Sequence, residues 1–167
     1  AIATIASGRR RRIDLGVING DYFANAAAMG VSPMIGETVP PGLKRYLGRL
    51  GYLVWAMRCL IRFRPFRLIV DDGKRQHKLW TTEVRIANGQ FHGGVELIDD
   101  AAPDDGQIAV QAVVGKSMAR LVWDWFARFF RLPARNLVTE EFRGSRFRLE
   151  TRPRQKVSID GEVLTKT

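Results

Sequence analysis

Two segments of the chain repeat their apolar residues at helical spacing. From residue 43 to about residue 63, apolar side chains recur every three or four positions, which predicts an amphipathic helix. Pro65 ends this helix, because the residue before a proline avoids the helical region. A second helix is predicted from Ser117 to about Leu132, ahead of Pro133. The expected buried stripes are Leu43, Tyr46, Leu47, Leu50, Leu53, Val54, Met57, Leu60 and Ile61 in the first helix, and Leu121, Val122, Trp125, Phe126 and Phe129 in the second.

Elsewhere the hydrophobic pattern has a period of two, which is the side-chain period of a β-strand. Strands are predicted at 13–18, 22–29, 66–70, 79–87, 108–114, 137–143, 147–152 and 156–159, with a loop at 30–42 and a glycine-weakened strand or loop at 90–98. Asn-Gly or Asp-Gly pairs border these segments at 19–20, 72–73, 88–89, 105–106 and 160–161. Such short turns join antiparallel neighbours. The predicted fold class is therefore mainly β: an antiparallel β-sandwich, or a strongly curved sheet, decorated by two amphipathic helices.

Length and charge narrow the range of partners. The chain has 167 residues, enough for one domain, and a net charge of +10. Such an excess of positive charge predicts an anionic partner, which could be nucleic acid, an anionic membrane face or a phosphorylated ligand. Because the arginines are not interleaved with aromatics in a nucleic-acid-binding pattern, we expect no nucleic-acid partner. Arginines also interrupt the apolar runs before they reach the length of a membrane span.

Cysteine and histidine are too scarce to build a site. The single cysteine, Cys59, excludes an internal disulfide and a cysteine-cluster metal site, and we expect it to be a small buried apolar residue. The two histidines, His77 and His92, are too isolated for a zinc site, and no role is assigned to His92.

Two acidic segments could carry chemistry. Asp160-Gly161-Glu162 follows a short strand and has the composition of a hairpin turn, which could also hold two acids at the mouth of a cleft. Four aspartates lie within seven positions at 99–105. This loop could bind a hard cation such as Mg²⁺ through carboxylate and carbonyl oxygens, or it could simply be solvated.

The polar face of the first helix has an unusual composition, with arginines beside tyrosine and tryptophan. These residues suit a membrane interface, where the ring lies at headgroup level and the cation meets phosphate; packing against the sheet or another subunit is the alternative. The residues concerned are Arg45, Arg49, Tyr52, Trp55, Arg58 and Arg62, of which Arg49, Trp55, Arg58 and Arg62 are the predicted membrane or phosphate contacts.

Nothing in the chain matches a nucleotide-binding loop, since neither GxxxxGK[ST] nor GxGxxG occurs. Residues 1–8 have the character of a helix end or linker leading from a preceding domain, and residues 9–167 form the predicted sandwich.

The order of the short motifs resembles that of the bacterial diacylglycerol kinase and lipid kinase family, which is related to sphingosine and ceramide kinases. The similar segments, read in chain order, are RRIDLG with Asn19-Gly20, YFAN at 22–25, LGRLGY at 47–52, RPF at 64–66, NGQFHGG at 88–94, APDDG at 102–106 and IDGE at 159–162. Each segment is weak evidence, but their joint order over nearly the whole chain is specific.

This resemblance implies a C-terminal domain that works with an N-terminal nucleotide-binding domain absent from this chain. Glu162 would accept the proton of the lipid hydroxyl, with Asp160 near the γ-phosphate of ATP. A structural Mg²⁺ would be held by the Asp105 carboxylate and the backbone oxygens of Ala102 and Gln107. The fragment by itself is expected to be inactive, and the full protein to be a cytoplasmic enzyme associated peripherally with anionic membranes.

Two other properties stay open at this level. The chain could instead be a non-catalytic basic module that binds anionic lipid or assembles subunits, and exposed edge strands make a homodimer plausible. Diacylglycerol, phosphatidylglycerol and sphingoid bases all carry a suitable hydroxyl, so the lipid substrate is not specified.

Overall fold

The computed structural model describes residues 7–8, 10–89, 91–92, 95–96, 102–130, 132 and 138–166. These residues form three helices: α2 (Val31–Thr38), α3 (Pro41–Arg62) and α4 (Met118–Phe129). The strands are β1 (Gly16–Ile18), β2 (Asp21–Phe23), β3 (Ala26–Gly30), β4 (Phe66–Asp71), β5 (Gln76–Ala87), β6 (Phe91–His92), β7 (Val95–Glu96), β8 (Ile108–Val114), β9 (Thr139–Gly144), β10 (Arg148–Arg152), β11 (Lys156–Ile159) and β12 (Glu162–Lys166). Most of the predicted helix end or linker at 1–8 lies outside the described residues.

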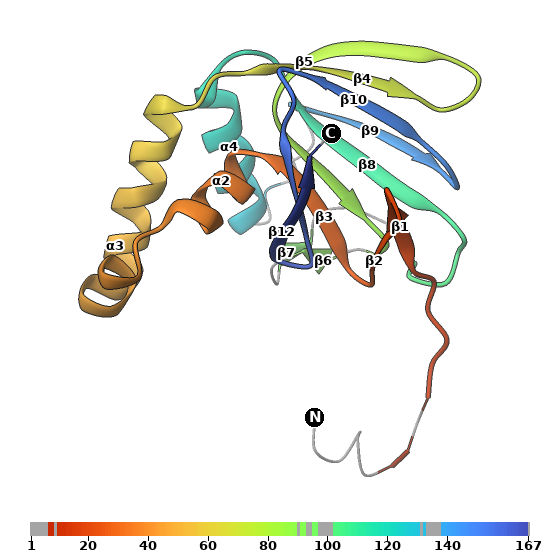
Figure 1. Ribbon diagram of the computed structural model, residues 1–167, viewed down its shortest axis with the longest axis horizontal. Coiled ribbons are helices and arrows are strands. Elements are labelled where there is room, and N and C mark those ends of the chain that lie inside the picture. Colours follow the sequence, from red (N-terminus) through yellow and green to blue (C-terminus); the bar gives the residue numbers. More distant parts are fainter. Residues whose placement is uncertain are drawn as a thin grey trace.

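Eight strands form one antiparallel sheet, which confirms the predicted mainly β fold (Figure 1). Its central strand is β5, whose first half pairs with β4 and whose second half pairs with β3. The register shifts between Thr81 and Glu83 on the side facing β8, and local irregularities of this kind bend a strand. One long strand thereby joins the β10–β4 part of the sheet to the β3–β11–β12 part and shapes the sandwich.

The sheet separates two apolar cores. One face carries the larger core, which includes Met29, Val84, Ile86 and Val110. Alternate residues point to the other face, where Val113 packs with residues of the helices such as Ile35 and Leu121. All three helices lie at the same end of the molecule (Figure 1). The helices therefore cover one face of the sheet, and the opposite face carries the larger core.

The prediction of a loop at 30–42 was wrong, because these residues contain α2. Pro33 suggested a break, but it lies in the first turn of the helix, where its missing N–H costs little. Gly30 begins the turn with a φ of 108°, and a Cβ there would lie 2.4 Å from the Thr82 carbonyl oxygen. Close approach to β5 thus requires glycine, and burial of Val31 and Ile35 stabilises a helix that local sequence does not favour.

Several predicted strand boundaries also change. The expected strand at 22–29 is two strands, β2 and β3, that belong to different sheets. The break falls at Ala24 and Asn25, whose N–H groups donate to a side chain rather than to a neighbouring strand. The strand predicted at 13–18 shortens to β1, and β12 follows the turn at 160–161 as an additional strand.

The buried stripes of the helices were partly misplaced. Val54, Met57 and Ile61 were expected inside but are 64%, 52% and 80% exposed. The apolar residues that α3 buries against the sheet side include Ala56, Cys59 and Leu60, as expected for Cys59. In α4, Val122 and Phe126 are likewise about half exposed. Both helices are apolar around more of their circumference than the fold needs, so spacing could not identify the buried side.

A buried charged cluster fastens two helices to the sheet. Arg85 of β5 pairs with Glu83 at 2.6 Å and with Asp124 of α4 at 2.8 Å, and all three side chains are at most 4% exposed. Its guanidinium also donates to Gln111 of β8, and Ser32 of α2 donates to Glu83 at 2.6 Å. Burial lowers the pKa of Arg85, but the neighbouring carboxylates of Glu83 and Asp124 outweigh that effect and raise it.

Candidate functional site

The turn at 160–161 is clamped by one carboxylate. Asp160 and Gly161 have φ values of 46° and 97°, and Ile159 pairs with Glu162, so this is the predicted two-residue hairpin turn. One oxygen of the Asp160 carboxylate accepts the N–H of Ala24 at 2.8 Å, and the other accepts those of Asn25 and Ala26 at 3.1 and 3.0 Å. The Asp160 N–H donates in turn to the Ala26 carbonyl at 2.9 Å. Because both oxygens accept backbone N–H groups, the Asp160 carboxylate holds the turn against residues 24–26.

Glu162 is the first residue of β12 and its side chain is exposed. Among the described residues, no hydrogen bond or ion pair reaches its carboxylate. The turn therefore presents one acid that is engaged by the backbone and one that is free to meet a substrate.

The acidic loop is organised in a similar way by Asp105. Its carboxylate accepts the N–H of Gln107 at 2.9 Å and that of Ala102 at 3.3 Å, so the three predicted metal-binding residues lie together. Asp104 forms an exposed ion pair with Arg11 at 2.9 Å. Residues 97–101, including Asp99 and Asp100, lie outside the described residues.

Two polar residues to which the sequence analysis assigned no role in the site, Asp14 and Asn88, connect the loop to the turn. Asp14 accepts the Gly106 N–H with its carboxylate at 2.8 Å and donates its own N–H to the Pro103 carbonyl at 2.7 Å. The buried Asn88 side chain donates to the carbonyls of Asp14 and Ala24 at 2.6 and 3.3 Å. A continuous chain of hydrogen bonds thus runs from the acidic loop to the segment that Asp160 holds. Neither the sequence of the acidic loop nor that of the Asp160-Gly161 turn predicts this connection.

Asn88 shows how a correct motif was misread. The Asn88-Gly89 pair was predicted as a turn at the end of a strand, but neither residue has the positive φ of a two-residue hairpin turn. Instead Asn88 is 2% exposed and its N–H donates to the Asn25 carbonyl at 3.0 Å. An amide can make these bonds with both donor hydrogens and its backbone, which an aliphatic residue could not.

The donor set of the acidic loop fits a hard cation. Carboxylate and carbonyl oxygens are the ligands that Mg²⁺ and Ca²⁺ prefer, and Asp105, Ala102 and Gln107 are held within one short turn. Within the described part of the chain, no group of three or more His, Cys, Asp or Glu side chains could hold a metal. A cation here would depend on backbone oxygens beside a single carboxylate.

The predicted membrane contacts are only partly available. Trp55 is half-buried and its indole N–H donates to the Thr38 hydroxyl at 3.0 Å, so its polar edge points to α2. Arg58, whose guanidinium lies 5.9 Å from the centre of the Trp55 ring, and Arg62 are exposed. The side chain of Arg49 lies outside the described residues.

A different set of residues on these helices is apolar and exposed. Val54, Met57 and Ile61 of α3 are exposed. Met57 and Ile61 line a groove of about 340 Å³ together with Val122 of α4, and Val54 lies one helical turn before Met57. Lys116 lies in this groove as well. The exposed apolar residues of α4 and its C-terminal turn are Val122, Trp123, Phe126 and Phe130. We call these six residues of α3 and α4, together with Phe130, the α3–α4 face.

Comparison with known proteins adds a family. Residues 25–167 match the family described as "YegS C-terminal NAD kinase beta sandwich-like domain". The chain is 26% identical over 167 residues to a protein of Staphylococcus carnosus (strain TM300) named "Putative lipid kinase", covering 98% of this chain and 54% of that protein. A similarly named protein of Staphylococcus aureus (strain MSSA476) is 27% identical over 161 residues, covering 93% of this chain and 52% of the relative.

Solved structures agree on the fold. A diacylglycerol kinase crystal structure from Bacillus anthracis str. Sterne superposes with a TM-score of 0.61 at 17% identity, covering 93% of this chain and 48% of that one. A second structure, described as "Crystal structure of a putative diacylglycerol kinase from Bacillus anthracis str. Sterne", gives a TM-score of 0.73 at 20% identity over 98% of this chain and 53% of that one. The chain therefore spans about half the length of the relatives it matches.

Proposed function

Because this chain belongs to the YegS C-terminal NAD kinase beta sandwich-like family, we propose that it is the substrate-side half of a two-domain lipid kinase. The reaction would transfer the γ-phosphate of ATP to a lipid hydroxyl, with diacylglycerol as the substrate class. The observation that carries this proposal is the free, exposed Glu162 carboxylate on a turn that Asp160 fixes by three hydrogen bonds.

In this proposal Glu162 accepts the proton of the attacking hydroxyl. Phosphoryl transfer requires positioning, charge neutralisation and a base within reach of the nucleophile. Asp160 serves as a positioning residue, because its oxygens accept the N–H groups of residues 24–26. Asp14 and Asn88 connect the acidic loop to the same segment by hydrogen bonds. A hydrogen-bonded network therefore supports the turn that carries Glu162.

The remaining requirements fall to other groups. ATP would bind to an N-terminal half, because this chain contains no glycine-rich phosphate loop. A Mg²⁺ ion would be held by the Asp105 carboxylate and the backbone oxygens of Ala102 and Gln107. There its charge would stabilise the loop that contacts Asp14.

A kinase assay tests the function. We expect the protein that joins this domain to a nucleotide-binding half to transfer labelled phosphate from ATP to diacylglycerol in mixed micelles, and we expect these 167 residues by themselves to transfer none. Turnover by the isolated domain would contradict the division of labour. Absence of turnover with every lipid alcohol would favour the alternative of a non-catalytic lipid-binding or subunit-assembly module.

The α3–α4 face has the distribution of positive and apolar side chains that suits contact with an anionic lipid surface. The sequence of α3 has no acidic residue, and the only acid in α4, Asp124, is buried against Arg85. Exposed cations flank the apolar side chains at Arg58, Arg62 and Lys116. Apolar residues with peripheral cations match the interface between acyl chains and anionic headgroups. None of the helices in the described residues is long and apolar enough to span a bilayer. We therefore propose that this face rests on the membrane that contains the substrate.

Vesicle sedimentation tests the membrane contact. Replacing Ile61 or Phe126 with serine should each weaken binding to anionic vesicles by about tenfold, because each removes one large apolar side chain from the acyl boundary. Ile61 is 80% exposed and Phe126 is 48% exposed, so neither substitution should prevent folding. Replacing Arg58 and Arg62 with alanine should reduce binding chiefly at low salt.

Trp55→Phe provides the control. Its indole bonds to Thr38 rather than facing solvent, so this variant should bind vesicles as the wild type does. Unchanged binding by the Ile61 and Phe126 variants would exclude the α3–α4 face as the contact. Dimerisation through the exposed strand edges stays a separate prediction, which the sedimentation coefficient of the lipid-free protein would test.

A further inference from the structure

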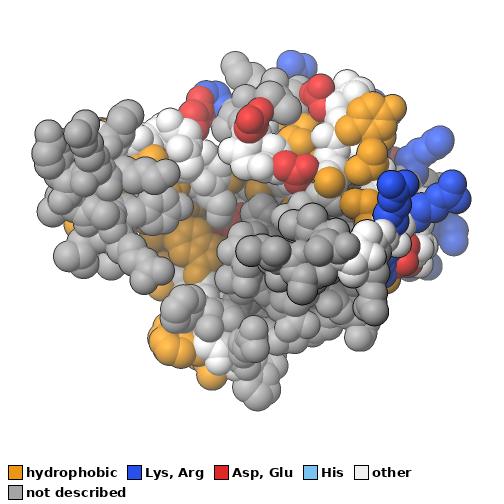
Figure 2. Space-filling model, turned by 90° about the horizontal axis from the view of Figure 1, so that it is seen from below, with side chains coloured by type: hydrophobic (Ala, Val, Ile, Leu, Met, Phe, Trp, Pro, Cys, Tyr) orange, Lys and Arg blue, Asp and Glu red, His pale blue; other side chains and the backbone are white. Residues whose placement is uncertain are grey.

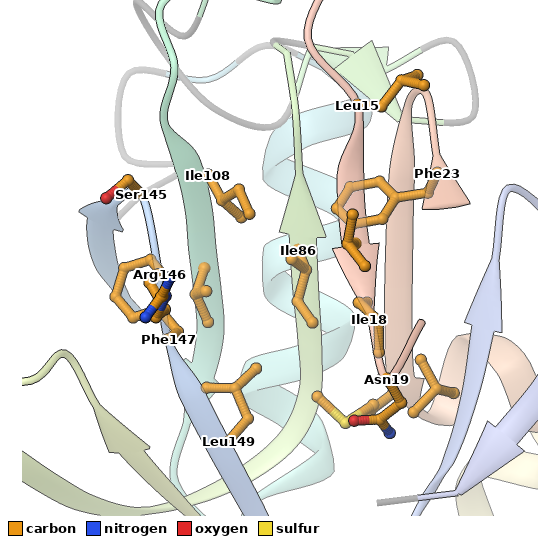
Figure 3. A pocket seen from close by; sticks show the side chains of 14 residues that line it. Leu15, Ile18, Asn19, Phe23, Ile86, Ile108, Ser145, Arg146, Phe147 and Leu149 are labelled. Atoms are coloured by element: carbon orange, nitrogen blue, oxygen red, sulfur yellow. The ribbon is translucent and has the colours of Figure 1, made fainter. Parts of the chain in front are cut away.

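The larger core of the sandwich contains an open cavity on the face of the sheet away from the helices. Its volume is about 450 Å³, within the range of small-molecule sites. Figure 3 shows the side chains converging on it from β1, β2, β5, β8 and the β9–β10 turn. Most of its lining side chains are apolar, among them Leu15, Val17, Phe23, Ile86, Phe147 and Leu149.

The β1–β2 hairpin leaves this end of the core open. The hairpin forms a separate two-stranded sheet and contributes the buried Phe23, whose ring lies against Gly16. A Cβ on Gly16 would lie 2.0 Å from Cζ of that ring, so only glycine permits this arrangement. Leu15 and Val17, by contrast, line the cavity while remaining 54% and 51% exposed. They form an apolar rim rather than a closed wall.

Three polar side chains complete the lining: Asn19, Ser145 and Arg146. Among the described residues, none of the three makes a side-chain hydrogen bond or ion pair. The nearby arginines differ, because Arg143 pairs with Glu141 and Arg148 with Glu150. Arg146 is thus an uncompensated cation beside an apolar cavity. The β9–β10 strands extend toward the end of the molecule away from α3 (Figure 1), and Lys and Arg side chains gather at that end in Figure 2.

We propose that this cavity binds a single-chain anionic lipid, with its acyl chain among the apolar walls and its headgroup on Arg146. Among the described residues, a lining of mainly apolar side chains with one exposed, unpaired arginine and two hydrogen-bonding side chains matches a carboxylate or phosphate head joined to an alkyl chain. The site lies across the sheet from the α3–α4 face and is separate from the proposed chemistry at Glu162.

Binding of cis-parinaric acid, a fluorescent fatty acid, tests the proposal without a kinase assay. We expect the purified protein to enhance its fluorescence, and palmitate and lysophosphatidate to displace it. Arg146→Ala should weaken palmitate binding by about tenfold, through loss of one charge-assisted contact, and leave methyl palmitate binding unchanged. Val17→Trp should abolish binding of both compounds by filling the rim. Relative displacement by palmitate and lysophosphatidate identifies which headgroup the site prefers.

Variants away from both the cavity and the α3–α4 face are the controls. Lys74→Trp and Arg75→Ala change exposed side chains in the turn between β4 and β5 and should bind cis-parinaric acid normally. Both test residues in the cavity rim are exposed, so the variants should retain the wild-type circular dichroism and melting temperature. The proposal is overturned if the wild type does not bind, if Val17→Trp binds normally, or if Arg146→Ala affects acid and ester alike.

Discussion

Replacing Glu162 with glutamine should lower kcat for lipid phosphorylation by roughly two to three orders of magnitude in the two-domain protein. Glutamine keeps the size and hydrogen-bonding reach of the side chain but cannot accept the proton of the attacking hydroxyl. Glu162 is exposed, and its carboxylate makes no hydrogen bond or ion pair to the described residues, so the substitution should not destabilise the fold. The measurement is steady-state kinetics with diacylglycerol in mixed micelles, with KM for ATP expected to stay the same.

Asp160 provides the contrast within the same turn. Asp160→Ala removes the acceptor of three backbone N–H groups and should destabilise the fold by about 2 kcal/mol, with activity falling as the turn loosens. Asp160→Asn should lose less, because asparagine tolerates the positive φ of 46° and retains one oxygen. Wild-type activity in Glu162→Gln would contradict the role of Glu162 as the base. Equal melting temperatures for Asp160→Ala and the wild type would contradict the role of Asp160 in holding the turn.

Replacing Arg85 with methionine should reduce the free energy of unfolding by about 3–5 kcal/mol, the largest stability effect expected of a single substitution here. Methionine fills much of the same volume, so the loss comes from the carboxylates of Glu83 and Asp124. Both are buried and would lose the cation that pairs with them. Urea unfolding followed by tryptophan fluorescence measures the change.

Two further variants separate the buried cluster from generic loss of charge. Arg148→Ala breaks an ion pair that is 80% and 46% exposed, and should change stability by less than about 1 kcal/mol. Combining Arg85→Met with Glu83→Gln and Asp124→Asn should recover part of the stability, because no buried charge then lacks a partner. If the single and triple variants are equally unstable, packing rather than charge pairing explains the cluster.

The cluster should also hold the helices over the whole physiological pH range. The carboxylates of Glu83 and Asp124 raise the pKa of Arg85 above its ordinary value, so its stabilising contribution is fully present at neutral pH and is lost only at strongly alkaline pH. Since α2 and α4 both bond to β5 through this cluster, we expect the helices that carry the α3–α4 face to keep their position on the sheet at neutral pH.

The sequence predicted the turn at one end of the site but not the hydrogen bonds that connect it to the acidic loop. The hairpin at Asp160-Gly161 followed from local chemistry, because two successive positive φ angles demand that composition. The role of Asp14 could not be predicted, since its partners lie at 103 and 106, about 90 residues along the chain. A side chain whose bonding partners come from a distant loop leaves no periodic trace in its own neighbourhood.

Local patterns determined the strands, the two-residue turns, α3 and α4, and the order of motifs that identifies the family, because each depends on residues close together in the chain. Long-range packing decided the rest. Contact with β5 made a helix of residues 31–38, and the Asp160 carboxylate divided residues 22–29 into two strands. Packing also determined which apolar residues of α3 and α4 are buried. Both helices have more apolar surface than the sheet can cover, so the remainder is exposed as the α3–α4 face.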